Sequence, residues 1–308
     1  MRIVFMGTPD FAVDCLEALV KSTHDVVAVF SQPDKPQGRK QIMTPPEVKV
    51  CAEKYNIPVY QPATLRDGTS TPLLKELNPD LIVVVAYGKL IPQEILDIPK
   101  FGCVNVHGSI LPKLRGAAPI QWAVINGEKV TGVTTMQLDA GLDTGDILLI
   151  KETEIDENET SGELFDRLKV LGAEVLMETI DAMLKGELNP VKQDDSKATY
   201  ASMLNKSISP VDWSKSAFEV HNHIRGLEPW PVATTEINGK PVKLFGSRMG
   251  KTCGNAAGEV VNAEKEFEVC CGDGNSVIIT QLQAQGKNKL SSADFLRGFK
   301  IEKGTVLK

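Results

Sequence analysis

The six residues LIVVVA, at positions 81–86, form the longest apolar run of the 308-residue chain. A strand that is apolar at every position is covered on both faces, which is typical of a parallel sheet flanked by helices. Further β-branched runs alternate with helical patterns along the first half of the chain, and this alternation predicts an α/β fold built on a parallel sheet. The strands are expected at 2–6, 26–31, 81–86, 102–107 and 131–137.

Helical patterns fill the intervals between these strands. The clearest lies at 161–185, where apolar residues recur three and four positions apart and form one stripe that must be buried. We expect this stripe to pack on the sheet. The other helices are expected at 10–21, 46–55, 71–77 and 118–126.

The length predicts a second domain, because single domains usually have roughly 100–200 residues. Residues 189–206 are polar and are interpreted as a linker between domains at 1–188 and 207–308. Beyond the linker, short alternating runs are separated by turn signals such as Asn238-Gly239 and Gly272-Asp273-Gly274. Such spacing predicts a small β-barrel.

Charge is divided unevenly between the two parts. Residues 1–188 carry 18 Lys and Arg against 27 Asp and Glu, whereas residues 189–308 carry 16 against 13. The mildly basic second part is compatible with binding of a polyanion. Hydrophobic residues at 42% and charged residues at 24% exclude wholesale disorder and a membrane-protein composition.

Cysteine spacing and the N-terminus bear on the compartment and on metals. None of the six cysteines forms a C-x-x-C motif, so we expect reduced structural cysteines and no metal site. The first predicted strand begins at Arg2, which leaves no room for a signal peptide, and a cytoplasmic protein is expected.

Polar side chains gather where the predicted strand 102–107 ends. Side chains alternate along a strand, so Asn105 and His107 project from the same face, about 6–7 Å apart. Open α/β sheets hold ligands at the carboxyl ends of their strands. An amide beside an imidazole is suited to acyl transfer, since it can polarise a carbonyl and move a proton. The alternative is a polar rim with no catalytic role.

An acidic group is expected as the third member of this site, in the glycine-rich loop 138–147. Asp139, Asp143 and Asp146 all lie there, after the predicted strand 131–137. The sequence does not distinguish among the three carboxylates, and Asp-Thr-Gly or Asp-Ala-Gly segments also form ordinary turns.

The connection at 32–46 is unusually long and contains four prolines. Long connections in compact domains are commonly functional. Lys35, Arg39 and Lys40 lie in it and are candidates for contact with nucleic-acid phosphates. A flexible, solvated insertion is the alternative.

The stretches that carry these residues resemble a known family, the tetrahydrofolate-dependent formyltransferases. The similarity is densest in HGSILPKLRGAAPIQWAVINGE (107–128) and MQLDAGLDTGDIL (136–148), and it covers nearly the whole chain. Further segments narrow it to the members that act on methionyl-tRNA. These are MGTPDFAV (6–13), QPDKPQGR (32–39), VDWS (211–214) and IRGLEPWP (224–231).

The resemblance implies a Rossmann-like catalytic domain at 1–188 and an OB-like, tRNA-binding β-barrel at 207–308. It matches the family's catalytic asparagine, histidine and aspartate to Asn105, His107 and Asp143, and its tRNA-contacting arginine to Arg39. The folate-binding loop is matched by Ser109, Ile110, Leu111 and Pro112.

The implied reaction moves the formyl group of 10-formyltetrahydrofolate, a co-substrate, to the α-amine of methionyl initiator tRNA. The product, N-formylmethionyl-tRNA, serves translation initiation. Initiator methionyl-tRNA and the folate are the implied partners, and no metal, membrane or obligate protein partner is expected.

Three other functions compete with this interpretation. A formyltransferase for a small amine, such as a ribonucleotide or an amino sugar, would share the same three residues. An inactive RNA-binding relative would have no evident need for them. An NAD-dependent oxidoreductase is disfavoured because the turn Gly7-Thr8-Pro9-Asp10 lacks the G-x-G-x-x-G motif.

Overall fold

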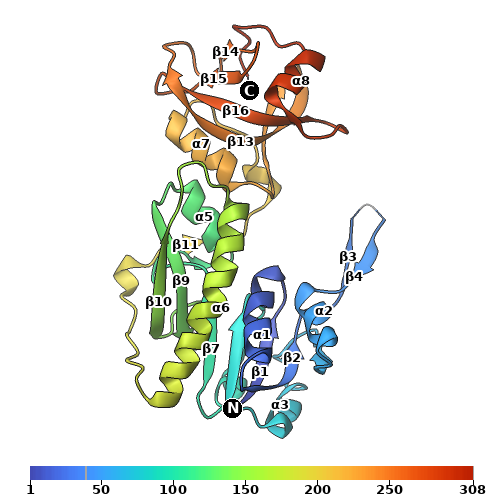
Figure 1. Ribbon diagram of the computed structural model, residues 1–308, viewed down its shortest axis with the longest axis vertical. Helices are drawn as coiled ribbons and strands as arrows, with labels where there is room; N and C mark the ends of the chain where they lie inside the picture. The colour runs from blue at the N-terminus through green and yellow to red at the C-terminus, as the bar shows by residue number, and fades with distance from the viewer. Residues whose placement is uncertain (39, 308) are drawn as a thin grey trace. The chain divides into compact units, whose positions relative to one another are not determined.

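A computed structural model describes every residue except 39 and 308, and the chain forms two compact units (Figure 1). Two segments that lie between parts of the first unit in sequence belong to the second unit. The N-terminal unit comprises Met1–Ala117, Gly132–Thr153 and Phe165–Ala201, and the C-terminal unit comprises Ala118–Thr131, Glu154–Leu164 and Ser202–Lys308. The domain limits inferred from the sequence stay a prediction.

The N-terminal unit is built on one sheet with the strand order β10-β9-β7-β6-β1-β2-β5. Strands β5, β2, β1, β6 and β7 are parallel to their neighbours, and β9 is antiparallel to β7. The strands are β1 (Arg2–Gly7), β2 (Asp25–Phe30), β5 (Val59–Tyr60), β6 (Leu81–Val85), β7 (Cys103–His107), β9 (Val130–Gln137) and β10 (Ile147–Glu154).

Helices cover one face of this sheet through residues that alternate along the strands. Val4 of β1 and Ile82 of β6 belong to a buried cluster that contains Leu74 of α3 (Thr71–Leu77) and Ile95 of α4 (Gln93–Leu96). Because side chains alternate, the intervening strand residues face the opposite side.

The opposite face of β7 is covered by the long helix α6 (Ser161–Lys185). Gly172 of α6 lies so close to β7 that a Cβ atom there would be 3.3 Å from Cγ1 of Val106. The helix also contacts the turn η1 (Asp10–Ala12) before α1 (Val13–Val20), where the Phe11 and Phe165 rings are 5.4 Å apart. Helix α2 (Glu47–Lys54) follows the hairpin of β3 (Lys35–Gln37) and β4 (Ile42–Thr44).

Residues 186–201 run back from α6 within the N-terminal unit. Val191 bridges to Ile147, the turn η2 (Asp195–Lys197) follows, and β11 (Tyr200–Ala201) pairs in parallel with β8 (Arg115–Gly116). We call residues 186–201 the return segment.

The C-terminal unit is a mostly antiparallel sheet with the order β12-β13-β16-β15-β14, to which β17 adds on β16. Its core gathers strand residues with Val220 of α7 and Phe295 of α8. Ile125 of α5 packs against the same core. The elements are α5 (Pro119–Ile125), η3 (Lys206–Ile208), α7 (Ala217–Gly226), β12 (Ala233–Ile237), β13 (Lys240–Thr252), β14 (Val260–Asn262), β15 (Phe267–Cys270), β16 (Asn275–Ala284), β17 (Leu290–Ser291) and α8 (Ser292–Gly298).

The predicted fold class is confirmed: a mostly parallel α/β sheet is followed by a mostly antiparallel β unit. Helices α3 and α6 have the predicted bounds, and each expected strand is present within a residue or so of its prediction. Strand β10 was not anticipated, and the connection 32–46 contains the β3–β4 hairpin. Within the described residues, no helix is long and apolar enough to cross a membrane.

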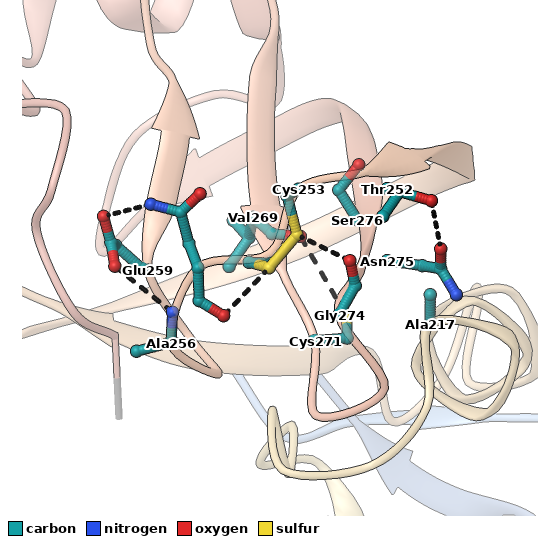
Figure 2. Close-up of a disulfide and its surroundings, with 12 residues drawn as sticks. Ala217, Thr252, Cys253, Ala256, Glu259, Val269, Cys271, Gly274, Asn275 and Ser276 are labelled. Carbon is teal, nitrogen blue, oxygen red and sulfur yellow. Dashed lines mark hydrogen bonds between the residues drawn. A yellow bond between two sulfur atoms is a disulfide. The ribbon is translucent and has the colours of Figure 1, made fainter.

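One pair of cysteines differs from the prediction. Cys253 and Cys270 form a disulfide in the C-terminal unit, so the expectation of reduced cysteines is wrong for this pair (Figure 2). Cys253 follows β13 and Cys270 ends β15, and both strands pair with the start of β16. Sheet pairing brings the two together, which the 17-residue separation in sequence does not reveal.

Thiol counting tests this pairing. The unfolded protein, prepared without reductant, is expected to show four thiols, because Cys15, Cys51, Cys103 and Cys271 are free. After reduction it is expected to show all six. Titration with a chromogenic disulfide reagent measures both values. Six thiols before reduction would contradict the pairing.

Candidate active site

The two polar residues of β7 lie at the centre of the candidate site. Asn105 is paired with Val84 of β6 and Met136 of β9, and His107 is paired with Thr134 of β9. Alternation along the strand puts both side chains on the same face. Their exposed fractions are 8% and 5%, so both sit in a largely desolvated environment.

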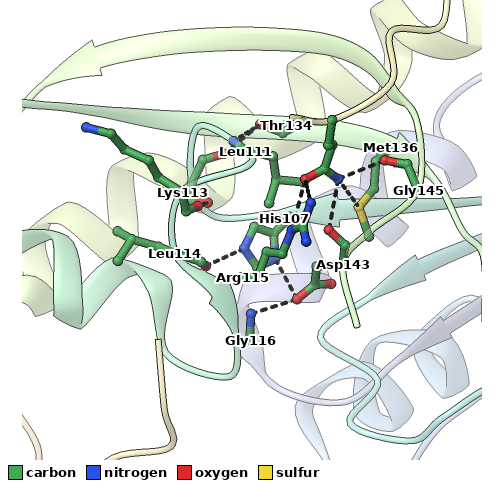
Figure 3. A network of polar contacts seen from close by, with 12 residues as sticks. His107, Leu111, Lys113, Leu114, Arg115, Gly116, Thr134, Met136, Asp143 and Gly145 are labelled. Atoms are coloured by element: carbon green, nitrogen blue, oxygen red, sulfur yellow. Dashed lines mark hydrogen bonds and ion pairs between the residues drawn. The ribbon is translucent and has the colours of Figure 1, made fainter. Parts of the chain in front are cut away.

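The ring of His107 is held from both sides (Figure 3). Nε2 lies 2.9 Å from the carbonyl oxygen of Leu114, and Nδ1 lies 3.7 Å from Oδ2 of Asp143. A carbonyl oxygen only accepts hydrogen bonds, so Nε2 carries a hydrogen. Nδ1 is therefore the nitrogen that can gain or lose a proton, and it faces a carboxylate.

The carboxylate of Asp143 is fixed by the neighbouring loop. Its Oδ2 accepts a 2.7 Å hydrogen bond from the backbone N–H of Gly116, and only 13% of the side chain is exposed. By contrast, Oδ1 of Asp139 accepts from Gly141 N and Thr144 Oγ1. This is the ordinary turn that the sequence offered as the alternative to a catalytic role. The structure thus brings Asp143 to His107, and its catalytic role is a proposal.

Asn105 has a different environment from the other two residues. Its carboxamide makes no hydrogen bond to any residue that the structure describes, and its polar atoms are not sealed from solvent. The amide can therefore donate to an added ligand without breaking an existing bond. Cys103, two residues earlier on β7, is not a candidate nucleophile, because burial and then Asp97 raise the pKa of its thiol to about 12.

The loop that follows β7 contains the four residues matched to folate binding. Thr134 of β9 fixes its backbone, donating from Oγ1 to Ser109 O at 2.6 Å and accepting from Leu111 N at 3.2 Å. Ser109 and Leu111 are buried, whereas Ile110 and Pro112 are partly exposed. The loop that follows His107 is thus held in place by hydrogen bonds to Thr134. That it binds folate stays a prediction.

Two of the residues expected to contact tRNA, Lys35 and Lys40, lie in the segment of the β3–β4 hairpin. Lys35 and Lys40 are exposed, and Nζ of Lys35 donates to Gln32 Oε1 at 2.7 Å. Arg39 lies outside the described residues. The base of the hairpin is anchored, since Lys49 Nζ is 2.9 Å from Asp34 Oδ1.

Two residues that take part in the contacts around Asp143 were not predicted from the sequence. They are Arg115 and Gln193. Arg115 follows the candidate folate loop, and Gln193 lies in the segment interpreted as a linker. A glutamine in a polar stretch carries no signal of its own. Only the path of the return segment brings it to the carbonyl oxygens of Asp143 and Gly145.

No group of three His, Cys, Asp or Glu side chains among residues 1–38 and 40–307 is arranged to hold a metal ion. The side chains that meet at this site are an amide, an imidazole and a carboxylate. Together they can stabilise a developing oxyanion and move protons.

Two family models match the chain: "Formyl transferase" over residues 1–180 and "Formyl transferase, C-terminal domain" over residues 203–300. These matches place the chain among the formyltransferases.

Full-length relatives narrow this class. The chain is 49% identical to the methionyl-tRNA formyltransferase of Citrifermentans bemidjiense over 308 residues, covering 100% of this chain and 96% of the relative. It is 48% identical to that of Clostridium novyi over 311 residues, covering 100% of both. The chain belongs to the methionyl-tRNA formyltransferase family.

Solved structures of lower identity share the fold. WlaRD, a sugar 3N-formyltransferase crystallised with dTDP and 5-N-formyl-THF, has a TM-score of 0.70 at 23% identity, over 94% of this chain and 99% of that one. HypX from Aquifex aeolicus, in complex with tetrahydrofolic acid, has a TM-score of 0.63 at 18% identity, over 99% of this chain and 50% of that one.

Proposed function

We propose that this enzyme transfers the formyl group of 10-formyltetrahydrofolate to the α-amine of methionyl initiator tRNA, with Asn105, His107 and Asp143 as its catalytic residues. The observation that carries the proposal is the approach of Asp143 to His107, 3.7 Å apart, beside the free amide of Asn105. Full-length identity of 48–49% to methionyl-tRNA formyltransferases supports this choice of substrate.

The amine needs little activation before it reacts. An α-amine with a pKa of about 7.7–8.0 is roughly 10–15% neutral at pH 7, so deprotonating it costs only about 1 kcal/mol. The larger barrier is the tetrahedral intermediate. Its oxyanion must be stabilised, and a proton must reach the folate nitrogen before that nitrogen can leave.

Asn105 is assigned to the oxyanion. As the amine nitrogen bonds to the formyl carbon, negative charge develops on the formyl oxygen, and the Asn105 amide donates to it. The amide has no competing partner among the described residues. A single positioned donor of this kind is typically worth ~10²–10³ in rate.

His107 and Asp143 are assigned to the proton. Nδ1 of His107 takes the proton that the attacking nitrogen loses and returns it to the folate nitrogen, whose bond to the formyl carbon then breaks. The imidazolium that forms in between lies beside the Asp143 carboxylate and donates to Leu114 O. Acid–base assistance of this kind contributes typically ~10²–10⁴.

The β3–β4 hairpin and the C-terminal unit are assigned to tRNA. The hairpin stands out from the N-terminal unit in Figure 1 and presents the exposed side chains of Lys35, Lys40, Ile42 and Met43. Cations serve phosphates, and apolar groups serve base or sugar surfaces. Arg39, between these lysines in sequence, is the proposed contact to the acceptor end. A tRNA substrate also implies that the enzyme acts in the cytoplasm.

Formylation of charged tRNA tests the proposal. The enzyme is incubated with charged initiator tRNA and 10-formyltetrahydrofolate, and blocked methionine is counted. Asn105→Asp keeps the size of the side chain but replaces donors by acceptors, so its turnover is expected to fall ~10²–10³-fold. Formylation of a small amine or amino sugar, with no response to charged tRNA, would replace the proposed substrate. Normal turnover of Asn105→Asp would show that Asn105 does not donate to the oxyanion.

Substitution of the carboxylate tests the proton relay. Asp143→Asn keeps an acceptor for the Gly116 N–H but removes the charge that stabilises the imidazolium. We expect turnover to fall at least ~10²-fold and the pH dependence of turnover to change shape. Steady-state rates measured from pH 6 to 9 give both quantities. An unchanged pH–rate profile and turnover would show that the carboxylate does not control His107.

Removal of one cation tests the tRNA contact. Arg39→Ala is expected to raise KM for charged tRNA about tenfold, since a hydrogen bond to a charged group is worth roughly 1.5–3 kcal/mol. KM for the folate should stay the same, and the salt dependence of tRNA binding should weaken. Lys185→Ala, at an exposed position on α6, is the control. Equal losses toward both substrates would contradict the assignment.

A further inference from the structure

The return segment joins the two loops that meet at His107. On one side, Thr199 Oγ1 accepts a 2.9 Å hydrogen bond from Leu114 N, and β11 pairs with β8. On the other side, Val191 bridges to Ile147, which begins the strand after the Asp143 loop. Gln193 lies between these two attachments. The segment is thus a shared support for the residues on both sides of the imidazole.

Gln193 contacts both loops through a single carboxamide. Its Nε2 donates to Asp143 O and Gly145 O, both at 2.8 Å. Its Oε1 accepts from Nε and Nη2 of Arg115, at 3.0 and 2.8 Å. A guanidinium only donates and backbone carbonyls only accept, so this is the one orientation of the amide that satisfies all four contacts.

Arg115 makes that orientation obligatory. Only 2% of it is exposed, and a guanidinium has five N–H donors and no acceptor, so its buried donors require partners. One partner is Oδ1 of Asp195 at 2.8 Å, and the side chain of Asp195 is 80% exposed. The other is the Gln193 amide oxygen. The guanidinium therefore holds the amide oxygen of Gln193 in place.

These contacts form a closed ring. Gln193 binds the backbone carbonyl of Asp143, Arg115 binds Gln193, and Gly116, the next residue in the chain, donates its N–H to the Asp143 carboxylate. Asp143 is thereby held at its backbone and at its side chain. Its φ of 54° lies in the left-handed region, which a residue with a side chain adopts at a cost, so the conformation depends on such support.

We propose that Gln193 is a positioning residue, which keeps the Asp143 carboxylate facing Nδ1 of His107. Its hydrogen bonds go to Arg115 and to the carbonyl oxygens of Asp143 and Gly145, so it acts through the loop of Asp143. Its partner Arg115 fixes the direction of the amide. This inference rests on the proposed function of Asp143, and it adds a residue from a segment that the sequence presents as a linker.

Gln193→Glu is the informative variant. It keeps the size of the side chain and the acceptor for Arg115, but it turns a carboxylate oxygen toward two carbonyl oxygens in place of a donor. We expect kcat to fall ~10–100-fold, as for other groups that orient a reacting residue. KM for charged tRNA and for the folate should stay within about twofold, because neither substrate is touched.

A double-mutant comparison separates positioning from general structure. In the Asp143→Asn background, Gln193→Glu should reduce kcat by less than about threefold, because the group through which it acts is already gone. The pH–rate profile of Gln193→Glu should change in the same way as that of Asp143→Asn. Gln93→Glu is the matched control, since the exposed Gln93 of α4 donates from its amide to Asp97 Oδ1 and is assigned to neither substrate. It should leave kcat unchanged.

Failure of the proposed function and failure of the positioning role of Gln193 give different results. If the wild-type enzyme does not formylate charged tRNA, the proposed function fails. If it does, and Gln193→Glu has a normal kcat or loses activity equally in both backgrounds, the positioning role alone fails. Gln193→Asn, which keeps the amide one methylene shorter, covers the case in which the acidic variant does not fold. Its kcat should also fall, and a wild-type kcat for it would overturn the proposal.

Discussion

The contact on which the site depends is the hydrogen bond from Gly116 N to the carboxylate of Asp143. It joins the loop after β7, the strand that ends at His107, to the loop after β9, which carries Asp143. A φ of 115° and the closeness of Ala201 O, 2.8 Å from where a Cβ would lie, reserve position 116 for glycine. Gly116 thus lets the return segment, the loop after β7 and the Asp143 carboxylate approach one another closely.

The sheet explains why the site lies where it does. β9 is antiparallel to β7, so the loop after β9 begins beside the first residues of β7 and brings Asp143 back to His107. The carboxyl end of β7 lies beside that of the parallel strand β6. Strand β7 is buried, yet its polar side chains sit where the chain leaves the sheet, which is the usual ligand position of α/β folds. Thr134 of β9 holds the next loop through its hydroxyl.

Much of this was available from the sequence. The apolar run 81–86 and the apolar stripe of 161–185 predicted a strand and a helix that the structure confirms. The shared face of Asn105 and His107 follows from strand alternation. The choice among Asp139, Asp143 and Asp146 required the family resemblance, because turn formation suits all three. The role of Gln193 and the Cys253–Cys270 disulfide depend on contacts between segments that are separated in sequence, for which local patterns carry no signal. The β3–β4 hairpin is local, but strands of three residues are too short to give a pattern.

A structure determined with the stable analogue 5-formyltetrahydrofolate would show where the formyl group lies relative to Asn105, His107 and Asp143. The account predicts the formyl oxygen about 2.7–3.1 Å from the Asn105 amide nitrogen, with the Asp143 carboxylate still bound to Gly116 and facing Nδ1 of His107. A formyl group bound away from Asn105, or an Asp143 side chain turned to solvent in the complex, would contradict it.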